Sequence, residues 1–177
     1  MITLQPGEVK QVNVTLTAIL SDDICQGGVA TADSGRDSGS IFSADPQAAF
    51  DDNEATGWLS ALAAPPHWLK YDLGVSKVAN ILRFLAYAGN NYRVFEFTLE
   101  GSNDDANWTL LLNANHNGSG EWGTYTFTNS TPYRYYRFTV LTSKVDLPSN
   151  YDPPPPWGTG IFEVELKLGR SEMTKQH

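Results

Sequence analysis

The oxygen-rich segment at residues 49–58, with the sequence AFDDNEATGW, holds the side chains best suited to chemistry in this chain. Two aspartates, an asparagine, a glutamate and a threonine lie there between two aromatic residues. Ca²⁺ takes about 6–8 oxygen ligands and tolerates irregular geometry, so donors crowded into one turn favour a calcium site. Much later in the chain, GIFEVEL at residues 160–166 adds carboxylates on a segment that alternates like a strand. Together the two segments predict a β-sandwich in which one cation joins distant parts of the chain.

A second interpretation of the first segment needs no metal ion. Asp, Asn and Thr side chains often form hydrogen bonds with the backbone of their own turn. Both kinds of chemistry fit the composition of residues 49–58, and the sequence does not choose between them.

The elements that must position these donors are strands. Polar and apolar residues alternate, as in half-buried strands, over 12–18, 69–73, 95–99, 136–140 and 162–168. Residues 81–85 are more continuously apolar and predict a central strand, and residues 122–127 predict another. One short helical turn is expected after Asp45, which would cap it, with Pro46 in the first helical position. Strands divided by Gly, Asn, Asp and Ser clusters predict an all-β sandwich or barrel.

Five segments of this chain resemble, in order, motifs of the discoidin family, also called coagulation factor 5/8 type C domains. Its microbial members include the family 32 carbohydrate-binding modules. Residues 49–58 are similar to the family's A-F-D-G-N-x-x-T-x-W segment, and HWLKYDLG at 67–74 is similar to its W-I-x-x-D-L-G strand. The other three matches are FEFTLEGSNDDANW at 95–108, RYYRFTV at 134–140 and the closing strand at 160–166. The resemblance covers roughly residues 28–168, which is nearly the whole chain.

The resemblance implies an antiparallel β-sandwich jelly roll of the galactose-binding-domain-like type. The expected sandwich covers residues 21–169, and residues 1–20 are expected to form an extra N-terminal strand or a linker. Residues 170–177 are polar and are predicted to be a disordered tail. A chain of 177 residues is one domain of ordinary size.

The resemblance also implies a structural Ca²⁺ ion. Carried over from the family's motif, the ligands are Asp51, Asn53, Thr56 and Glu163, with main-chain carbonyl oxygens nearby. Asp52 stands where the family commonly has glycine, so the backbone of this loop and the choice of liganding aspartate are open. Such an ion would join the first loop to the last strand, and chelation would remove its contribution to stability.

In this family, ligands bind to loops at one end of the sandwich, and the corresponding loops here carry aromatic, amide and guanidinium groups. Sugars are recognised by an aromatic face against the pyranose ring and by planar polar groups on the hydroxyls. The residues expected to bind a glycan are Arg36, Tyr87, Asn90, Asn91, Arg93, Tyr151 and Trp157. Four consecutive prolines between Tyr151 and Trp157 favour a stiff extended loop that would lose little entropy on binding.

Structural roles are the alternative for several of these residues. Arg93 opens a strand, and covering one end of the sandwich is the alternative to sugar binding for Trp157. Three further tryptophans, Trp58, Trp68 and Trp108, occupy family core positions and are predicted to lie in the core. His116 is predicted to be a bystander at a loop tip, and His67 a strand-edge residue without a catalytic role.

The composition of the chain argues against several classes of partner. A net charge of −8 argues against nucleic acid and anionic lipid surfaces, and no apolar run approaches the roughly 18–20 residues of a membrane span. The single cysteine, Cys25, excludes an internal disulfide and is predicted to be a small buried residue. The common motifs of serine hydrolases, zinc peptidases and phosphate-binding loops are missing, so we expect no enzymatic activity.

These observations predict a non-catalytic carbohydrate-binding module or adhesin that recognises a glycan on a cell surface or a polysaccharide. The alternative is a structural or assembly module of a virion, such as a phage capsid, tail accessory or fibre protein, or of a cell-surface protein. In that case residues 1–20 would mediate contact with a second copy or with a parent assembly. No signal peptide is visible, and we expect an extracellular or virion-associated location.

Overall fold

The computed structural model describes residues 23–89, 92–143 and 158–169. The predicted strand at 12–18 and the predicted tail at 170–177 lie outside these residues. So do Asn90, Asn91, Tyr151 and Trp157, four of the seven residues expected to bind a glycan. The described residues contain no helix long and apolar enough to cross a membrane.

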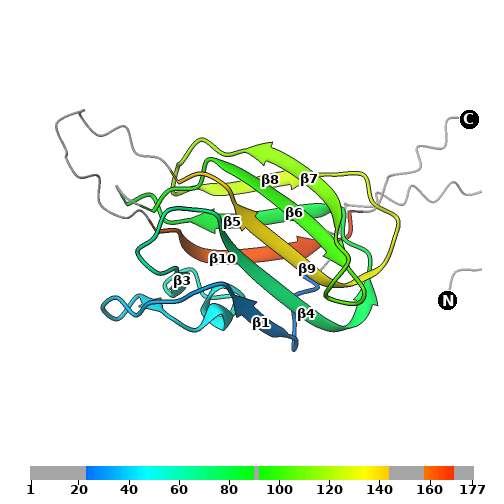
Figure 1. Cartoon of the computed structure of the whole chain (residues 1–177), viewed down its shortest axis with the longest axis horizontal. Helices are drawn as coiled ribbons and strands as arrows, with labels where there is room; N and C mark the ends of the chain where they lie inside the picture. The colour runs from blue at the N-terminus through cyan, green and yellow to red at the C-terminus, as the bar shows by residue number, and fades with distance from the viewer. Residues whose placement is uncertain (1–22, 90–91, 144–157, 170–177) are drawn as a thin grey trace, which may run out of the picture.

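Two five-stranded sheets pack face to face, which confirms the predicted all-β sandwich (Figure 1). The first sheet has the order β1-β4-β9-β6-β7 and the second the order β2-β3-β10-β5-β8. Neighbouring strands are antiparallel except for the parallel pair β2 and β3. The strands are β1 (Val29–Ala32), β2 (Phe42–Ser43), β3 (Gly57–Leu59), β4 (His67–Lys77), β5 (Ile81–Ala86), β6 (Glu96–Ser102), β7 (Thr109–Asn115), β8 (Trp122–Thr126), β9 (Tyr133–Val140) and β10 (Gly160–Lys167).

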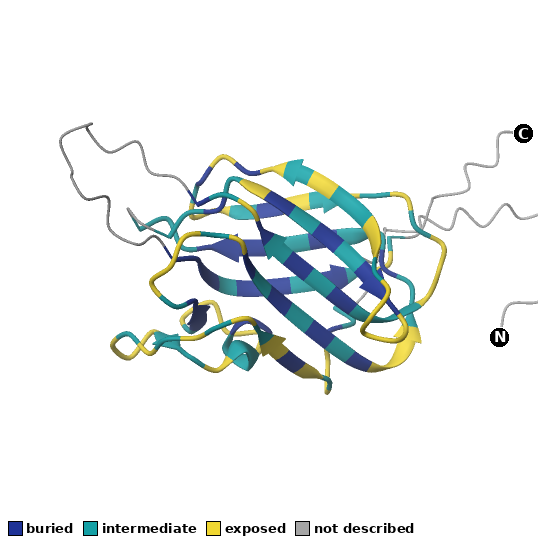
Figure 2. Cartoon of the chain, viewed as in Figure 1, coloured by how far each residue is buried: buried dark blue, intermediate teal, exposed yellow. Residues whose placement is uncertain are grey.

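The core lies between the sheets, where the inward-facing residues of the long strands alternate with outward-facing ones (Figure 2). In β4, Leu69 and Tyr71 are buried, and Lys70 between them faces outward. Trp58 is 1% exposed, as predicted, and Cys25 is also buried. The side-chain period of two along each strand therefore decides which aromatic residues enter the core.

The prediction that Trp68 and Trp108 lie in the core is wrong. Trp68 precedes the inward-facing Leu69, so its side chain must point to the outer face of the sheet, where it is half-buried. Trp108 is also half-buried, and the guanidinium group of Arg137 lies 4.2 Å from its ring centroid. Lys70 lies 5.8 Å from the ring of Trp68. Both indoles thus contribute cation–π contacts on the surface of the sheet.

The short helical turn is present as a 3₁₀ helix, η1 (Pro46–Ala49). Asp45 caps it by accepting a hydrogen bond from the Gln47 amide at 2.9 Å, and Pro46 occupies the first position, as predicted. The turn delivers Phe50 into the core, where its ring lies 4.7 Å from that of Tyr71. Asp51 follows directly, so packing of Phe50 fixes where the oxygen-rich loop begins.

Loops from both sheets gather at one end of the sandwich, on the left in Figure 1. They comprise residues 33–41, 60–66, 87–95 and 116–121, of which 90–91 are not described. Main-chain hydrogen bonds join them to the strand ends, including Arg36 N to Leu59 O at 2.9 Å and Gly160 N to Tyr92 O at 3.2 Å. The described parts of the predicted ligand loops therefore share one end of the fold.

Candidate functional site

The oxygen-rich loop is organised around Asp51. One carboxylate oxygen accepts a hydrogen bond from the Asn53 amide at 3.0 Å, and the other accepts one from the Thr56 hydroxyl at 2.9 Å. The Asn53 side chain in turn accepts a hydrogen bond from the amide of Ala55 at 3.1 Å. The hydrogen bonds expected of a metal-free turn are therefore present, and they bring the three predicted oxygen donors of this loop together.

Glu163 joins this group from β10, although it lies 110 residues away from Asn53 in the sequence. Its carboxylate accepts hydrogen bonds from the amides of Asn53 and Val164, each at 3.2 Å, and its side chain is only 2% exposed. Burial, together with the negative charges of Asp51 and Asp52, raises the pKa of Glu163 to about 8. The described residues around the Glu163 carboxyl group therefore supply no positive charge that would offset its ionisation.

Asp52 occupies the position at which the resemblance implies glycine, and its backbone conformation allows a side chain there. Its φ is +57°, in the left-handed region that Asp tolerates better than most residues. Its carboxylate accepts a hydrogen bond from Gln26 at 2.8 Å. Asp51 is therefore the aspartate that bonds Asn53 and Thr56 within the loop.

The predicted set of metal ligands includes only two carboxylates, those of Asp51 and Glu163. Over the described residues, no group of three or more His, Cys, Asp and Glu side chains is arranged to hold a metal ion. Any cation here would rely on amide, hydroxyl and main-chain oxygens for the rest of its shell. Ca²⁺ accepts such a mixture, whereas Zn²⁺ prefers nitrogen and sulfur.

At the loop end of the sandwich, Arg36 and Tyr87 are brought together through Tyr92. Arg36 donates a hydrogen bond to the Tyr92 hydroxyl at 3.0 Å, and the Tyr87 and Tyr92 rings lie 5.9 Å apart. Tyr87 also packs edge-on against Phe42, at 4.9 Å, and Phe162, at 5.7 Å. We call these five residues the rim cluster. The contribution of Phe42 and Phe162 was missed because it depends on strand pairing between distant segments.

Arg93 does not join the rim cluster through any hydrogen bond among the described residues. Its Nε donates to the carbonyl of Ala88 at 3.1 Å and so closes its own loop. This contact agrees with the structural alternative for Arg93.

The two described histidines differ from expectation. His116 is not an exposed loop-tip residue: it is 8% exposed, and its ring bonds the Tyr125 hydroxyl at 2.8 Å and the Ser119 carbonyl at 3.2 Å. His67 stands at the start of β4, as predicted, but it is buried. Its Nδ1 lies 2.8 Å from an Asp33 carboxylate oxygen and its Nε2 lies 2.9 Å from the Ala63 carbonyl oxygen. The His67 ring thus connects two loops at this end of the sandwich, and the His116 ring connects loop 116–121 to β8.

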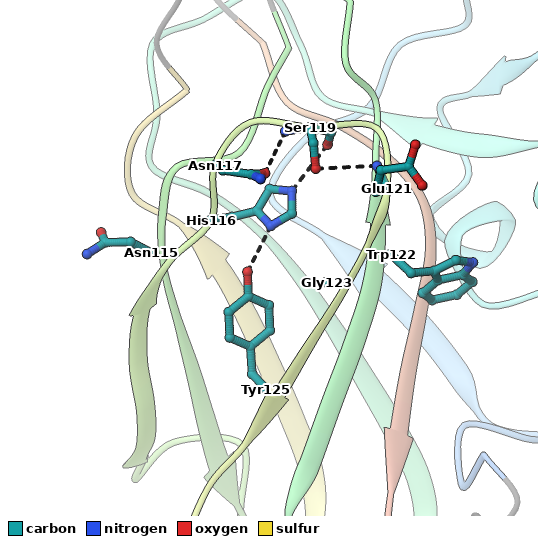
Figure 3. A pocket seen from close by; sticks show the side chains of 8 residues that line it. All are labelled: Asn115, His116, Asn117, Ser119, Glu121, Trp122, Gly123 and Tyr125. Carbon is teal, nitrogen blue, oxygen red and sulfur yellow. Dashed lines mark hydrogen bonds between the residues drawn. The ribbon is translucent and has the colours of Figure 1, made fainter.

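A polar hollow of about 400 Å³ lies beside His116, between the end of β7 and the start of β8 (Figure 3). Its lining includes Asn115, Glu121, Trp122 and Tyr125. The sequence pattern did not indicate it, because the two strands that border it belong to different sheets.

The fold and the order of its segments define the class of this protein. The model of the F5/8 type C domain family matches residues 29–151, so the chain belongs to that family. No curated protein sequence matches the chain.

Several solved structures share this fold. A family 32 module from Clostridium perfringens, in complex with GalNAc-β-1,3-galactose, is 23% identical with a TM-score of 0.68, over 83% of this chain and 100% of that one. Chitosan-binding module 1 of a chitosanase/glucanase from Paenibacillus sp. IK-5 is 26% identical with a TM-score of 0.65, over 82% and 98% of the two chains. The family 32 module of NanJ from C. perfringens, in complex with galactose, is 17% identical with a TM-score of 0.66, over 85% and 100%.

Proposed function

We propose that this protein is a non-catalytic carbohydrate-binding module that binds a glycan through the loops at one end of the sandwich. The rim cluster carries this proposal. A guanidinium group held against a phenol can donate hydrogen bonds to sugar hydroxyls, and the neighbouring aromatic rings offer apolar surface to a pyranose. Because these side chains already contact one another, little ordering entropy opposes binding.

The relatives support a glycan partner and an extracellular setting. The similar structures include modules solved with galactose, with GalNAc-β-1,3-galactose and with 4,5-unsaturated mannuronic acid, and one named for chitosan. A catalytic role finds no support in the rim cluster, because glycoside hydrolysis needs two carboxyl groups facing each other across the substrate. The rim cluster contains one guanidinium group and four aromatic rings instead.

A glycan array followed by titration calorimetry tests this function. We expect a single site with a Kd of roughly 10⁻³–10⁻⁴ M, which becomes useful through multivalency. Arg36→Ala should weaken binding at least about tenfold, a loss of about 1.4 kcal/mol. Arg134→Ala is the matched control, since that arginine lies on the sheet surface and pairs with Asp72. Equal affinity in the Arg36 variant and the native protein would contradict the proposed site.

We further propose that Ca²⁺ binds at Asp51, Asn53, Thr56 and Glu163 and has a structural role. The supporting observation is the buried carboxylate of Glu163, whose neighbouring charges are negative and whose hydrogen bonds, within the described part of the chain, come only from backbone amides. A bound Ca²⁺ ion would supply the missing positive charge and stabilise the folded form over the unfolded chain. The residues would then hold loop 51–56 against β10.

A further inference from the structure

The floor of the polar hollow is made of the rings of His116 and Tyr125, which contacts within the protein hold in place. Tyr125 stacks on Phe84 at 5.6 Å and packs edge-on against Phe97 at 4.8 Å. The Ser119 carbonyl only accepts, so His116 Nε2 carries a proton, and in the neutral ring Nδ1 then accepts the hydrogen bond of the Tyr125 hydroxyl. The polar atoms of the floor are thus satisfied within the protein, and the floor presents fixed ring surface (Figure 3).

Gly123 leaves the space above this floor open. A Cβ atom on Gly123 would lie 2.8 Å from Cε2 of Tyr125 and 3.2 Å from Nδ1 of His116. The first distance is shorter than van der Waals contact, so any side chain here would displace the ring pair. The absence of a side chain at this position therefore allows the rings of His116 and Tyr125 to lie against the backbone of β8 at Gly123.

The walls of the hollow carry polar groups that the described residues leave free. The Asn115 amide and the Glu121 carboxylate are exposed and form no hydrogen bond with any described residue. Asn117 uses its side-chain oxygen to accept from the Ser119 amide at 2.9 Å, which leaves its amide nitrogen available among the described residues. Amide and carboxylate groups around a fixed ring surface match the hydroxyls and the C–H face of a sugar ring.

The charge of the hollow selects among sugars. Glu121 is the only charged side chain that lines it in the described part of the chain, and neither lysine nor arginine does. The whole chain carries a net charge of −8. An anionic saccharide would therefore meet repulsion here, whereas a neutral sugar or an amino sugar would not.

The hollow adjoins the loop that carries the rim cluster's two tyrosines. A Cβ on Gly120 would lie 3.0 Å from Cβ of Ala88, and one on Gly118 would lie 3.3 Å from Cδ of Arg93. Loop 116–121 therefore packs directly against loop 87–95. The rim cluster and the hollow therefore border the same pair of packed loops.

We propose that the hollow beside His116 is a second saccharide subsite for a neutral or amino-bearing unit, so that the protein recognises an oligosaccharide. This inference rests on the proposed function and extends it. The first subsite is the rim cluster, and the second is formed by Asn115, Asn117 and Glu121 over the His116–Tyr125 floor.

Amide chemical-shift mapping on the full chain tests the inference. The probes are galactose, glucosamine, N-acetylglucosamine, the trimers of the two hexosamines and trigalacturonate. With at least one neutral or amino trimer, we expect shifts both in loop 87–95 and in residues 115–123, and a Kd about tenfold lower than for its monomer. Trigalacturonate should leave residues 115–123 unmoved.

The double variant Asn115→Ala/Glu121→Gln should bind the monomer as the native protein does and lose the tenfold gain of the trimer. Neither side chain bonds a described residue, so the fold should be retained. Asn113→Ala, two residues earlier on β7 and outside the hollow, is the control and should keep the gain. If the trimer shifts only loop 87–95, or if the double variant keeps the full gain, the second subsite is wrong while the proposed function stands. If no sugar shifts the amides of loop 87–95 or of residues 115–123, both the second subsite and the proposed function are wrong.

Discussion

Replacing Glu163 with glutamine should change the stability of this protein in opposite directions with and without calcium. The pKa of Glu163 is raised to about 8 by burial and by its acidic neighbours. An unfolded glutamate titrates near pH 4.3, so the folded state binds this proton more tightly than the unfolded chain does. In the absence of metal, the free energy of unfolding should therefore fall as the pH rises from about 4.3 to about 8.

The structure allows the magnitude to be worked out. Each pH unit between the two pKa values lowers the free energy of unfolding by about 1.4 kcal/mol. At neutral pH, ionisation of Glu163 in the unfolded chain therefore lowers the stability of the metal-free protein by about 3.5 kcal/mol. Glutamine removes this cost, but it offers one acceptor atom to two amides, those of Asn53 and Val164. Losing one such hydrogen bond costs about 1 kcal/mol. We expect Glu163→Gln to be about 2.5 kcal/mol more stable than the native protein in a chelator at neutral pH.

Calcium should reverse that order. An ion that binds only the folded state adds about 4.1 kcal/mol when its concentration is about a thousand times the Kd, and the glutamine variant should gain little of this. The assay is urea denaturation at pH 5, 7 and 8, in EGTA and in CaCl₂. Glu165→Gln is the control: this carboxylate pairs with Arg83 at 2.6 Å and Lys167 at 2.9 Å, so its variant should lose stability in both media. Equal stabilisation of the native and Glu163 variant proteins by calcium would refute the reasoning.

Three further changes probe other parts of the fold. Hydrogen bonds from Arg134 lower the pKa of Asp72, so this pair stabilises the fold above the unfolded pKa and loses its effect as the pH falls through the lowered one. Asp72→Asn should flatten the acid limb of a stability–pH profile. Glu54→Ala removes the acceptor for Nε1 of Trp122, at 3.1 Å, and should increase acrylamide quenching of tryptophan fluorescence without changing the circular dichroism spectrum. Phe97→Ala empties a fully buried site and should cost about 3–5 kcal/mol in urea unfolding, whereas Phe97→Leu should cost less.

The fold was predictable because strand alternation is a local property. In the long strands the alternation is strong enough that the core-facing residues can be read directly from the chain, as for Leu69 and Tyr71 in β4. The errors at Trp68 and Trp108 arose where the position in the family motif was given more weight than this alternation. A large aromatic residue is compatible with an outer sheet face when a cation covers its ring, as Lys70 and Arg137 do here.

The candidate sites were predictable only in part, because they depend on contacts between distant segments. The oxygen donors of loop 51–56 follow one another in the chain, so their common location was evident. The His116–Tyr125 pair was not, because it requires a glycine at position 123 and a hydrogen bond from the loop after β7 to β8, a strand of the other sheet. The contributions of Phe42 and Phe162 to the rim cluster depend in the same way on where the chain folds back.

Loop 51–56 contacts both ends of a row of side chains that runs from the proposed calcium site to the hollow. Glu163, Leu85 and Trp122 are paired across β10, β5 and β8, so their side chains share one face of the sheet. Loop 51–56 bonds both ends of this row, through the amide of Asn53 to Glu163 and through the carboxylate of Glu54 to Nε1 of Trp122. Trp122 also lines the hollow. A cation that fixes this loop would therefore hold one wall of the second subsite in place, so calcium should affect trimer binding more than monomer binding.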